Sequence, residues 1–330
     1  MAVLRYLGLA EEGSYNPDVA PQAAFHVDIA SATLDVPGEA QMIYGGGLNR
    51  SAYLHRPGFY APSGNIVYAM DIRTIAFLLK WALGGYKFTA GDPNLHEIWG
   101  SSDSFLPSFC ARLGKDLFEH VFHGCGINSL QIQVEGEFVL ATAEIIAAKD
   151  SRADIKDVTD LLLPDEYPLA FHEVTAKLGG TAVGDDKSAD IKSLTININN
   201  NLSAEDGRGI GSRHPYRLPA GERELTISKQ LWYEDIEQLQ TYRGGNDGPA
   251  NAGTTETELH ITIDSGEFGN LVMSLPRFVY TNVQQQPSGR DELVQSTEGR
   301  AFMTDQMLDD GTTEISTDAY VQVNNDGGEI

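Results

Sequence analysis

The residues best suited to chemistry lie together at positions 119–125. Glu119, His120, His123 and Cys125 carry carboxylate, imidazole and thiol groups, all of which bind transition metals. Side chains two positions apart on a strand share a face, so His123 and Cys125 would be able to contact one ion. Structural metal sites draw ligands from two segments, however, and we find no second cluster in the sequence. We expect a strand with two surface histidines here, and no metal.

Glycine-rich segments are the second candidate, as loops that bind phosphate or calcium. The triplet at residues 45–47 lacks the Lys-Ser/Thr pair of a phosphate-binding loop, and no helix is expected after residues 207–211. Residues 91–94 and 244–248 offer oxygen atoms without the alternating pattern of a calcium loop. The serines and carboxylates form no hydrolase or zinc-protease motif. We therefore predict that the protein is not an enzyme and binds no cofactor.

Strands are the main elements that would position these side chains. Alternating apolar and polar residues, such as Leu130, Ile132 and Val134 between Gln131 and Gln133, predict half-buried strands. A hairpin turn is expected at residues 135–136. The predicted strands span residues 24–34, 105–113, 117–123, 130–135, 137–147, 173–178, 191–198, 224–232, 258–263, 271–275, 278–283 and 319–323.

One helix is predicted at residues 71–83. Asp71 is suited to the N-cap, Ile72, Ile75 and Leu79 follow helical spacing, and Gly84 ends the helix. Its single apolar face predicts packing on a sheet. Short helices are expected at residues 155–163 and 234–242. The fold class is thus mainly β, a sandwich or barrel with one packed helix.

The chain divides into three parts by composition. Residues 1–23 form an N-terminal arm, residues 24–285 a β-domain, and residues 286–330 an extended acidic tail with one late strand. Within the domain, the Gly- and Pro-rich residues 37–64 predict a long irregular loop. Loops of this length usually contact a partner or carry function.

The charge balance restricts the partners of this chain. It has 47 acidic and 23 basic residues, of which 9 are Lys, and a net charge of −24 at pH 7. Such a surface repels nucleic acid and is typical of proteins that work in molar salt, which screens the repulsion. We expect no membrane segment and no signal peptide. Cys110 and Cys125 are predicted to be buried free thiols.

Four segments together resemble tailed-phage tail tube proteins, also called major tail proteins. They follow one another in the family's order over residues 71–280. Low Lys and high Asp indicate a virus of a halophilic archaeon. The four segments are the helix end LLKWALG at 78–84, GCGINSLQIQVEG at 124–136, DIKSLTININNNL at 190–202 and PAGERELT at 219–226.

The resemblance implies a structural role without chemistry. Family members form rings of six subunits that stack into the virion tail tube, with the helix outside the sheet that lines the bore. Ejected DNA passes through the bore without specific binding, and other tail proteins meet both ends of the tube. The resemblance also places the protein in the virion tail after synthesis in the host cytoplasm.

In several strands every second residue is polar, and these polar residues are candidates to face the lumen of the tube. These positions are small, uncharged or acidic, so they offer few cations to hold phosphates, although the outer face of any antiparallel sheet facing solvent has a similar pattern. The lumen-facing candidates are Gln131, Gln133, Glu135, Thr142, Glu144, Ser193, Thr195 and Asn197, and the same parity continues through Thr226, Ser228 and Gln230.

Apolar and aromatic residues of the arm and the long loop are candidates for contacts between subunits or rings. The contact candidates are Leu4, Tyr6, Leu7, Tyr44, Tyr53, Phe59 and Tyr60.

Two other functions stay open for the protein as a whole. A virion protein of similar architecture, such as a tail-end adaptor or a capsid decoration protein, would make no tube. A secreted halophilic carbohydrate-binding β-sandwich would need exposed tryptophans.

Overall fold

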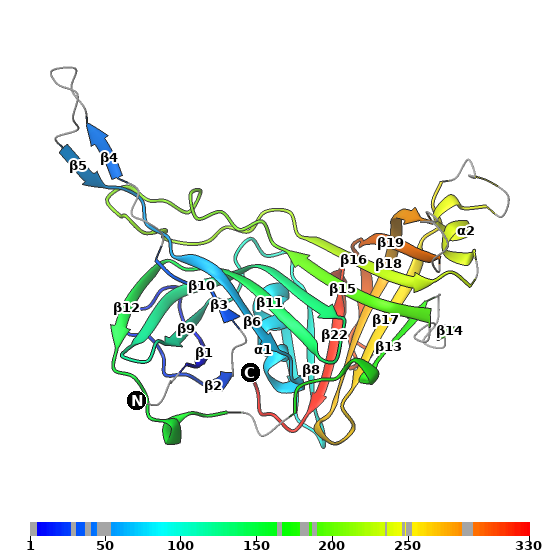
Figure 1. Cartoon of the computed structure of the whole chain (residues 1–330), viewed down its shortest axis with the longest axis horizontal. Helices are drawn as coiled ribbons and strands as arrows, with labels where there is room; N and C mark the ends of the chain where they lie inside the picture. The colour runs from blue at the N-terminus through cyan, green and yellow to red at the C-terminus, as the bar shows by residue number, and fades with distance from the viewer. Residues whose placement is uncertain are drawn as a thin grey trace.

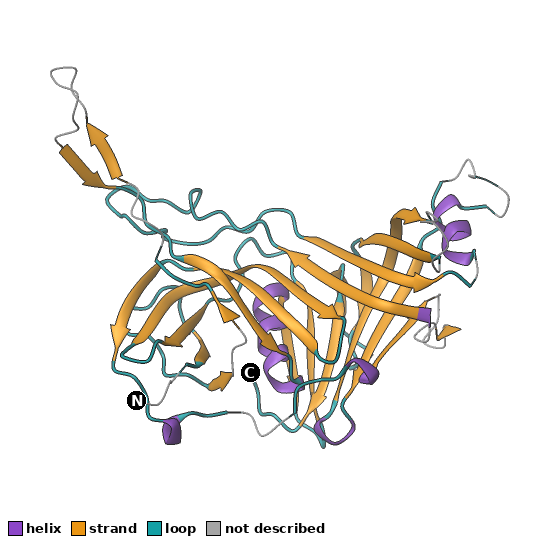
Figure 2. Cartoon of the chain, viewed as in Figure 1, coloured by secondary structure: helices purple, strands orange, loops and turns teal. Residues whose placement is uncertain are grey.

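Antiparallel strands dominate the computed structural model of the chain (Figure 2). The mainly β fold class predicted from the sequence is confirmed. None of the helices in the described part of the chain is long and apolar enough to cross a bilayer. The structure describes residues 5–27, 31–36, 41–44, 54–163, 167–178, 185–186, 190–234, 236–245, 248, 253–285 and 293–330.

Strands from the first half of the chain form what we call the N-terminal sheet. Leu7, Leu9 and Phe25 are buried in it, so the described part of the expected N-terminal arm belongs to the chain's own core. The spatial order is β2 (Phe25–Val27), β1 (Leu7–Glu11), β9 (Phe109–Gly114), β10 (Glu119–Val134) and β12 (Lys149–Ala153).

The long sheet combines strands from the whole chain. The hairpin between β10 and the next strand turns at Glu135 and Gly136, as predicted, with Gly136 at φ +85°. The spatial order is β3 (Ser31–Ala32), β6 (Ser63–Ala69), β11 (Val139–Ile146), β10, β15 (Ile191–Asn199), β16 (Glu224–Trp232), β19 (Val294–Ala301) and β18 (Asn270–Gln284).

A third group of strands, the second sheet, supplies the other layer of the core. Its apolar side chains join those of the other two sheets in one continuous hydrophobic cluster. The spatial order is β14 (Asp185–Asp186), β13 (Val174–Leu178), β17 (Thr257–Asp264), β18, β22 (Tyr320–Asn325), β8 (Asn94–Gly100) and β7 (Gly84–Thr89).

Two long strands each belong to two sheets. The first part of β10 pairs in the N-terminal sheet and the rest pairs in the long sheet, with an irregularity around Gly124 at φ +60°. Only glycine adopts that conformation without strain, so Gly124 is the corner of β10. In β18, residues 270–274 pair with β22 and residues 278–284 with β19, and Pro276 lies between. The sequence predicted each of these strands as two.

The ladders between the described strands do not close into a ring. They run from β3 to β7 through the shared strands and end at both edges. The chain is therefore consistent with a β-sandwich and is not a barrel on its own.

Helix α1 (Ile72–Leu83) confirms the helix prediction. Asp71 caps it by accepting a hydrogen bond from the Thr74 backbone N–H at 2.7 Å, and Gly84 ends it at φ +90°. Ten of its twelve residues are buried, and it contacts β10 on one side and β8, β7 and β22 on the other. The predicted packing on a sheet is therefore found, but it is more extensive than one apolar face implies. Strands lie on two sides of the helix, so even Thr74 and Lys80 are buried.

The remaining elements lie at the edges of the sandwich. Helix α2 (Glu237–Arg243) ends at Gly244 in the left-handed conformation, as predicted. The predicted helix at residues 155–163 is wrong, since only a 3₁₀ turn at Val158–Asp160 forms. Other 3₁₀ turns span Phe171–Glu173 and Gly266–Phe268.

Part of the segment predicted as a long irregular loop is a hairpin instead. Strands β4 (Gln41–Tyr44) and β5 (Leu54–Pro57) pair with each other and project from the body of the molecule (Figure 1). Residues 63–64, at the end of the predicted loop, already belong to β6. A second hairpin joins β20 (Thr304–Met307) and β21 (Glu314–Thr317).

The end of the chain is not an extended tail. Residues 293–330 supply β19 to the long sheet and β22 to the second sheet, where Val321 and Val323 are fully buried. The late strand predicted at residues 319–323 is β22, whereas β19 was not predicted because its residues are nearly all polar.

Trp81 is the largest buried side chain of α1, and its ring stacks on Phe109 of the N-terminal sheet at 4.3 Å. We expect Trp81→Ala to lower the free energy of unfolding by about 3–5 kcal/mol. The substitution leaves a cavity between the helix and the N-terminal sheet, and these layers cannot move together to fill it. Urea denaturation measures this loss. The exposed Leu117→Ala is the control and should change stability by less than about 0.5 kcal/mol.

Candidate functional site

The lumen-facing candidates lie on one face of the long sheet, which we call the polar face. Gln131 is opposite Thr142 on β11 and Asn197 on β15, and Gln133 is opposite Thr195. Paired residues of an antiparallel sheet point to the same side. The intervening residues Leu130, Ile132 and Val134 are buried on the other side.

The polar face continues across two more strands. Asn197, Thr195 and Ser193 on β15 are opposite Thr226, Ser228 and Gln230 on β16, which the alternation of β16 also predicted. Beyond them, Ser296 and Glu298 of β19 complete the row. These two residues were not predicted, because residues 294–301 are nearly all polar and carry no apolar alternation that would indicate a half-buried strand.

A shallow hollow of about 280 Å³ lies at one end of this face. Its lining brings together Glu135, Ser193 and Thr195, which are three of the candidates. Glu144 lies elsewhere on the face and accepts hydrogen bonds from Asn128 Nδ2 at 2.9 Å and Ser129 Oγ at 3.1 Å. These bonds hold the carboxylate against the sheet.

The cations near the polar face are paired or turned away from it. Arg300 forms ion pairs with Glu222 at 2.7 Å and Glu224 at 3.6 Å. Lys192 lies 3.9 Å above the Trp232 ring at the edge of the sheet. Lys229 is on the opposite parity of β16, and only 2% of it is exposed. The face therefore presents neutral and acidic groups with little free positive charge.

The candidates for subunit contacts have mixed positions. Tyr6 and Leu7 are buried within the chain, and Tyr6 Oη donates to Glu119 Oε1 at 3.1 Å. Tyr60 is also buried and donates to Asp150. These three side chains contact their own chain, so they have no free surface for a neighbour in this conformation.

Phe59 is half-buried beneath the guanidinium of Arg208, 4.5 Å from its ring centre. Tyr44 belongs to the projecting hairpin, in β4. Leu4 and Tyr53 lie outside the described residues.

The predicted surface histidines are buried, which corrects the expectation from the sequence. His120 Nε2 lies 2.8 Å from Asp150 Oδ2, and His123 Nε2 lies 2.8 Å from Ser151 Oγ on β12. Burial lowers the pKa of His123, so its neutral form is favoured. Both histidines are covered because β10 continues into two sheets, which its short sequence segment does not reveal.

The two cysteines are free and fully buried, and burial raises the pKa of Cys125 well above its ordinary value. A buried thiol that stays protonated is unreactive. Within the described residues, no three side chains of the His, Cys, Asp or Glu types are grouped to hold a metal ion.

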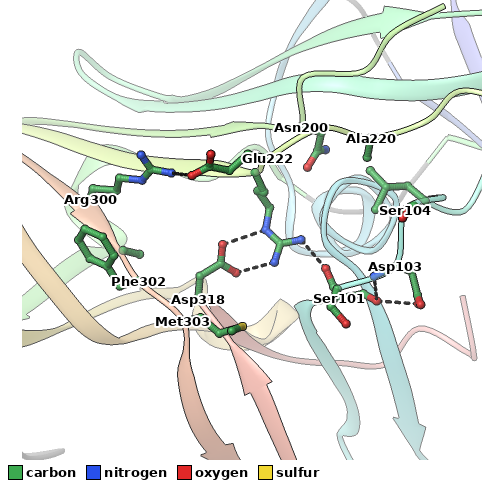
Figure 3. Close-up of a pocket in the computed structure, with 15 residues that line it drawn as sticks. Ser101, Asp103, Ser104, Asn200, Ala220, Glu222, Arg300, Phe302, Met303 and Asp318 are labelled. Carbon is green, nitrogen blue, oxygen red and sulfur yellow. Dashed lines mark hydrogen bonds and ion pairs between the residues drawn. The ribbon is translucent and has the colours of Figure 1, made fainter. Parts of the chain in front are cut away.

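A cavity of about 460 Å³ is lined in part by an ion pair that joins three strands, which we call the Arg223–Asp318 clamp (Figure 3). Arg223 forms a two-pronged ion pair with Asp318 at 2.8 and 2.9 Å and donates to the Ser101 carbonyl at 2.9 Å. A side chain at Gly100 would lie 2.2 Å from both charged groups. This arrangement joins the start of β16 to the end of β8 and the start of β22.

A family model described as phage tail tube protein matches residues 4–324. The chain belongs to this family. No curated protein matches it. The match covers nearly the whole chain, including β19 and β22, so the C-terminal strands are part of the tail tube fold. Tail tube proteins are structural components of the virion tail, and their family implies self-assembly into a tube together with other tail proteins.

Lys229 is the main electrostatic anomaly of this tail tube protein. Its Nζ donates to Tyr280 Oη at 3.0 Å and lies over the Phe278 and Tyr280 rings. Burial lowers the pKa of Lys229 from 10.5 to about 7. Between these two pH values the unfolded chain binds more protons, so stability rises with pH. The penalty is full below the folded pKa and fades above it.

We therefore expect Lys229→Met to raise the free energy of unfolding at neutral pH by a few kcal/mol, about 1.4 kcal/mol for each unit of pKa shift removed. The difference between variant and wild type should shrink as the pH rises toward 10.5, the ordinary lysine value. Urea titrations across this range measure it. Lys192→Met, at an exposed lysine, is the control, and a gain independent of pH contradicts the assignment.

Proposed function

We propose that six copies of this chain form a ring, that rings stack into the tail tube, and that viral DNA leaves through its bore. Membership of the tail tube family supports assembly into a tube. The open sandwich supports a shared wall, because its unpaired sheet edges are available to neighbouring subunits. The composition supports a halophilic archaeal host, since molar salt screens the repulsion among 47 acids.

The polar face is the lining of the bore in this proposal. The observation that carries it is the register across β11, β10, β15, β16 and β19, which aligns mostly neutral and acidic side chains over five adjacent strands. The cation in these rows, Arg300 opposite Thr226, is paired with Glu222 and Glu224. Phosphates bind mainly through Lys and Arg, so such a wall has little affinity for DNA and repels it slightly. DNA then slides without being held.

The projecting hairpin of β4 and β5 is the contact with the next ring. It extends beyond the body of the subunit, as shown in Figure 1, and its base is fixed by hydrogen bonds between the Tyr60 N–H and the Arg213 carbonyl and between Arg213 Nε and the Gly58 carbonyl. An anchored projection reaches a neighbour with little loss of conformational entropy. Other tail proteins meet the two ends of the tube, and the chain is made in the host cytoplasm.

Electron microscopy of the purified protein in molar KCl tests the assembly. We expect hollow tubes with regular axial striations and six-fold symmetry in cross-section. Single rings that do not stack would indicate a tail-end adaptor instead.

Lysine substitutions on the polar face test the lining. We expect the triple variant Gln131→Lys, Thr195→Lys and Ser228→Lys to assemble but to slow DNA ejection from virions, because three cations per subunit bind phosphates. Glutamate at the same three positions is the matched control and should leave the ejection rate near that of wild type. Equal rates for the lysine and glutamate variants would show that these strands do not face DNA.

A further inference from the structure

An exposed basic patch lies at one end of this acidic molecule. Residues 208–217 contain Arg208, Arg213 and Arg217 and no acidic residue, although Glu205 and Asp206 precede them. The side chains of Arg208 and Arg217 stack on Phe59 and Phe105 and form no ion pair within the described part of the chain. Guanidinium groups without an ion pair, such as those of Arg208 and Arg217, are unusual in a chain with twice as many acids as bases. They favour binding of an acidic partner at this patch.

An apolar hollow of about 280 Å³ lies beside Arg217. Leu202 and Leu218 are buried in its lining, while Phe105 and Tyr216 are 48% and 59% exposed. Tyr15 also lines it, and its buried hydroxyl has no hydrogen-bond partner among the residues that the structure describes. A buried donor without an acceptor is costly, and it favours a ligand that brings an oxygen atom. We call the basic patch and this hollow together the socket.

The segment 154–163 has the complementary chemistry. Asp154, Asp157 and Asp160 are exposed and form no ion pair within the described residues. Between and after them, Val158, Leu162 and Leu163 are 62%, 56% and 53% exposed. We call this segment the acidic knob, because its 3₁₀ turn at Val158–Asp160 presents apolar and acidic groups side by side.

The socket and the acidic knob lie at opposite edges of the subunit. In Figure 1 the yellow-green chain that follows β15 runs along the upper edge, beside the projecting hairpin, and the green turn that follows β12 lies at the lower edge. Two different surfaces on opposite sides of one subunit can join copies head to tail, which gives an open stack and not a closed pair.

We propose that the acidic knob of one copy docks into the socket of the next copy along the tube. The aspartates meet the guanidinium groups of Arg208 and Arg217, and the exposed apolar side chains of the knob fill the hollow. Tyr15 Oη donates to an oxygen of the incoming segment. This inference rests on the proposed stacking of rings and identifies the surfaces that join them. Opposite charges at the rim also fix the polarity of the stack.

Nucleic acid is the competing occupant of the socket. Three arginines are few for binding phosphates in a chain with a net charge of −24, and the leucine and aromatic side chains of the hollow are poor partners for a phosphate. The acidic knob, in contrast, supplies both the charge and the apolar groups.

A charge-swap experiment on the full chain tests the proposal. The socket variant carries Arg208→Glu and Arg217→Glu, and the knob variant carries Asp157→Arg and Asp160→Arg. We expect each variant alone to form rings and to lose about tenfold or more of its sedimentable tubes, because like charges meet at the contact. Mixing the two should restore tubes, since each remaining contact then joins opposite charges.

Electron microscopy and sedimentation give the readout, with thermal melting to confirm folding. Arg243→Glu, on the exposed end of α2, is the control and should leave tubes intact. If a double variant does not fold, Arg217→Glu and Asp157→Arg replace it.

The outcomes separate the two proposals. Wild-type protein that forms no tubes overturns the proposed function together with this inference. Wild-type tubes with variants that also form tubes, or with a mixture that stays disassembled, overturn only the inference. So does a socket variant that assembles normally and has lost binding to duplex DNA, which would assign the socket to nucleic acid.

Discussion

The burial of α1 between layers of strands determines how the other elements are arranged. A helix with ten of twelve residues buried needs strands on more than one side, and the three sheets supply them. Lys80, near its C-terminal end, forms an ion pair with Glu11 at 2.5 Å and donates to the Ile330 carbonyl at 2.6 Å. Residues near both ends of the described chain, Glu11 and Ile330, therefore contact the same helix.

The shared strands convert this enclosure into one rigid unit. Because β10 and β18 each pass from one sheet to another, the sheets cannot slide independently around the helix. The Arg223–Asp318 clamp reinforces the same junction from the other end of the sandwich. The polar face lies on strands that are fixed in this way, which suits the proposed role of this face as the wall of a tube.

The charge distribution separates the surfaces of the subunit. On the polar face, positive charge is paired, as in Arg300, or withdrawn beneath the sheet, as in Lys229. At the upper edge, Arg208 and Arg217 remain exposed and without ion pairs within the described residues. The proposed lining of the bore and the proposed contact with a neighbour thus differ in whether their cations are paired or available.

Helices, strands and turns that depend on the spacing of nearby residues could be predicted from the sequence alone. The capped helix at α1, the strands β11, β15 and β16 and the turn at Gly136 follow from spacing over a few residues, and the side-chain alternation of β10, β11 and β15 placed the lumen-facing candidates on one parity. Only the tertiary structure decided that His120 and His123 are buried, that β10 is one strand, and that the acidic C-terminal segment belongs to the core. These features depend on pairing between residues far apart in the chain, and local periodicity carries no information about which distant strand will cover a given face.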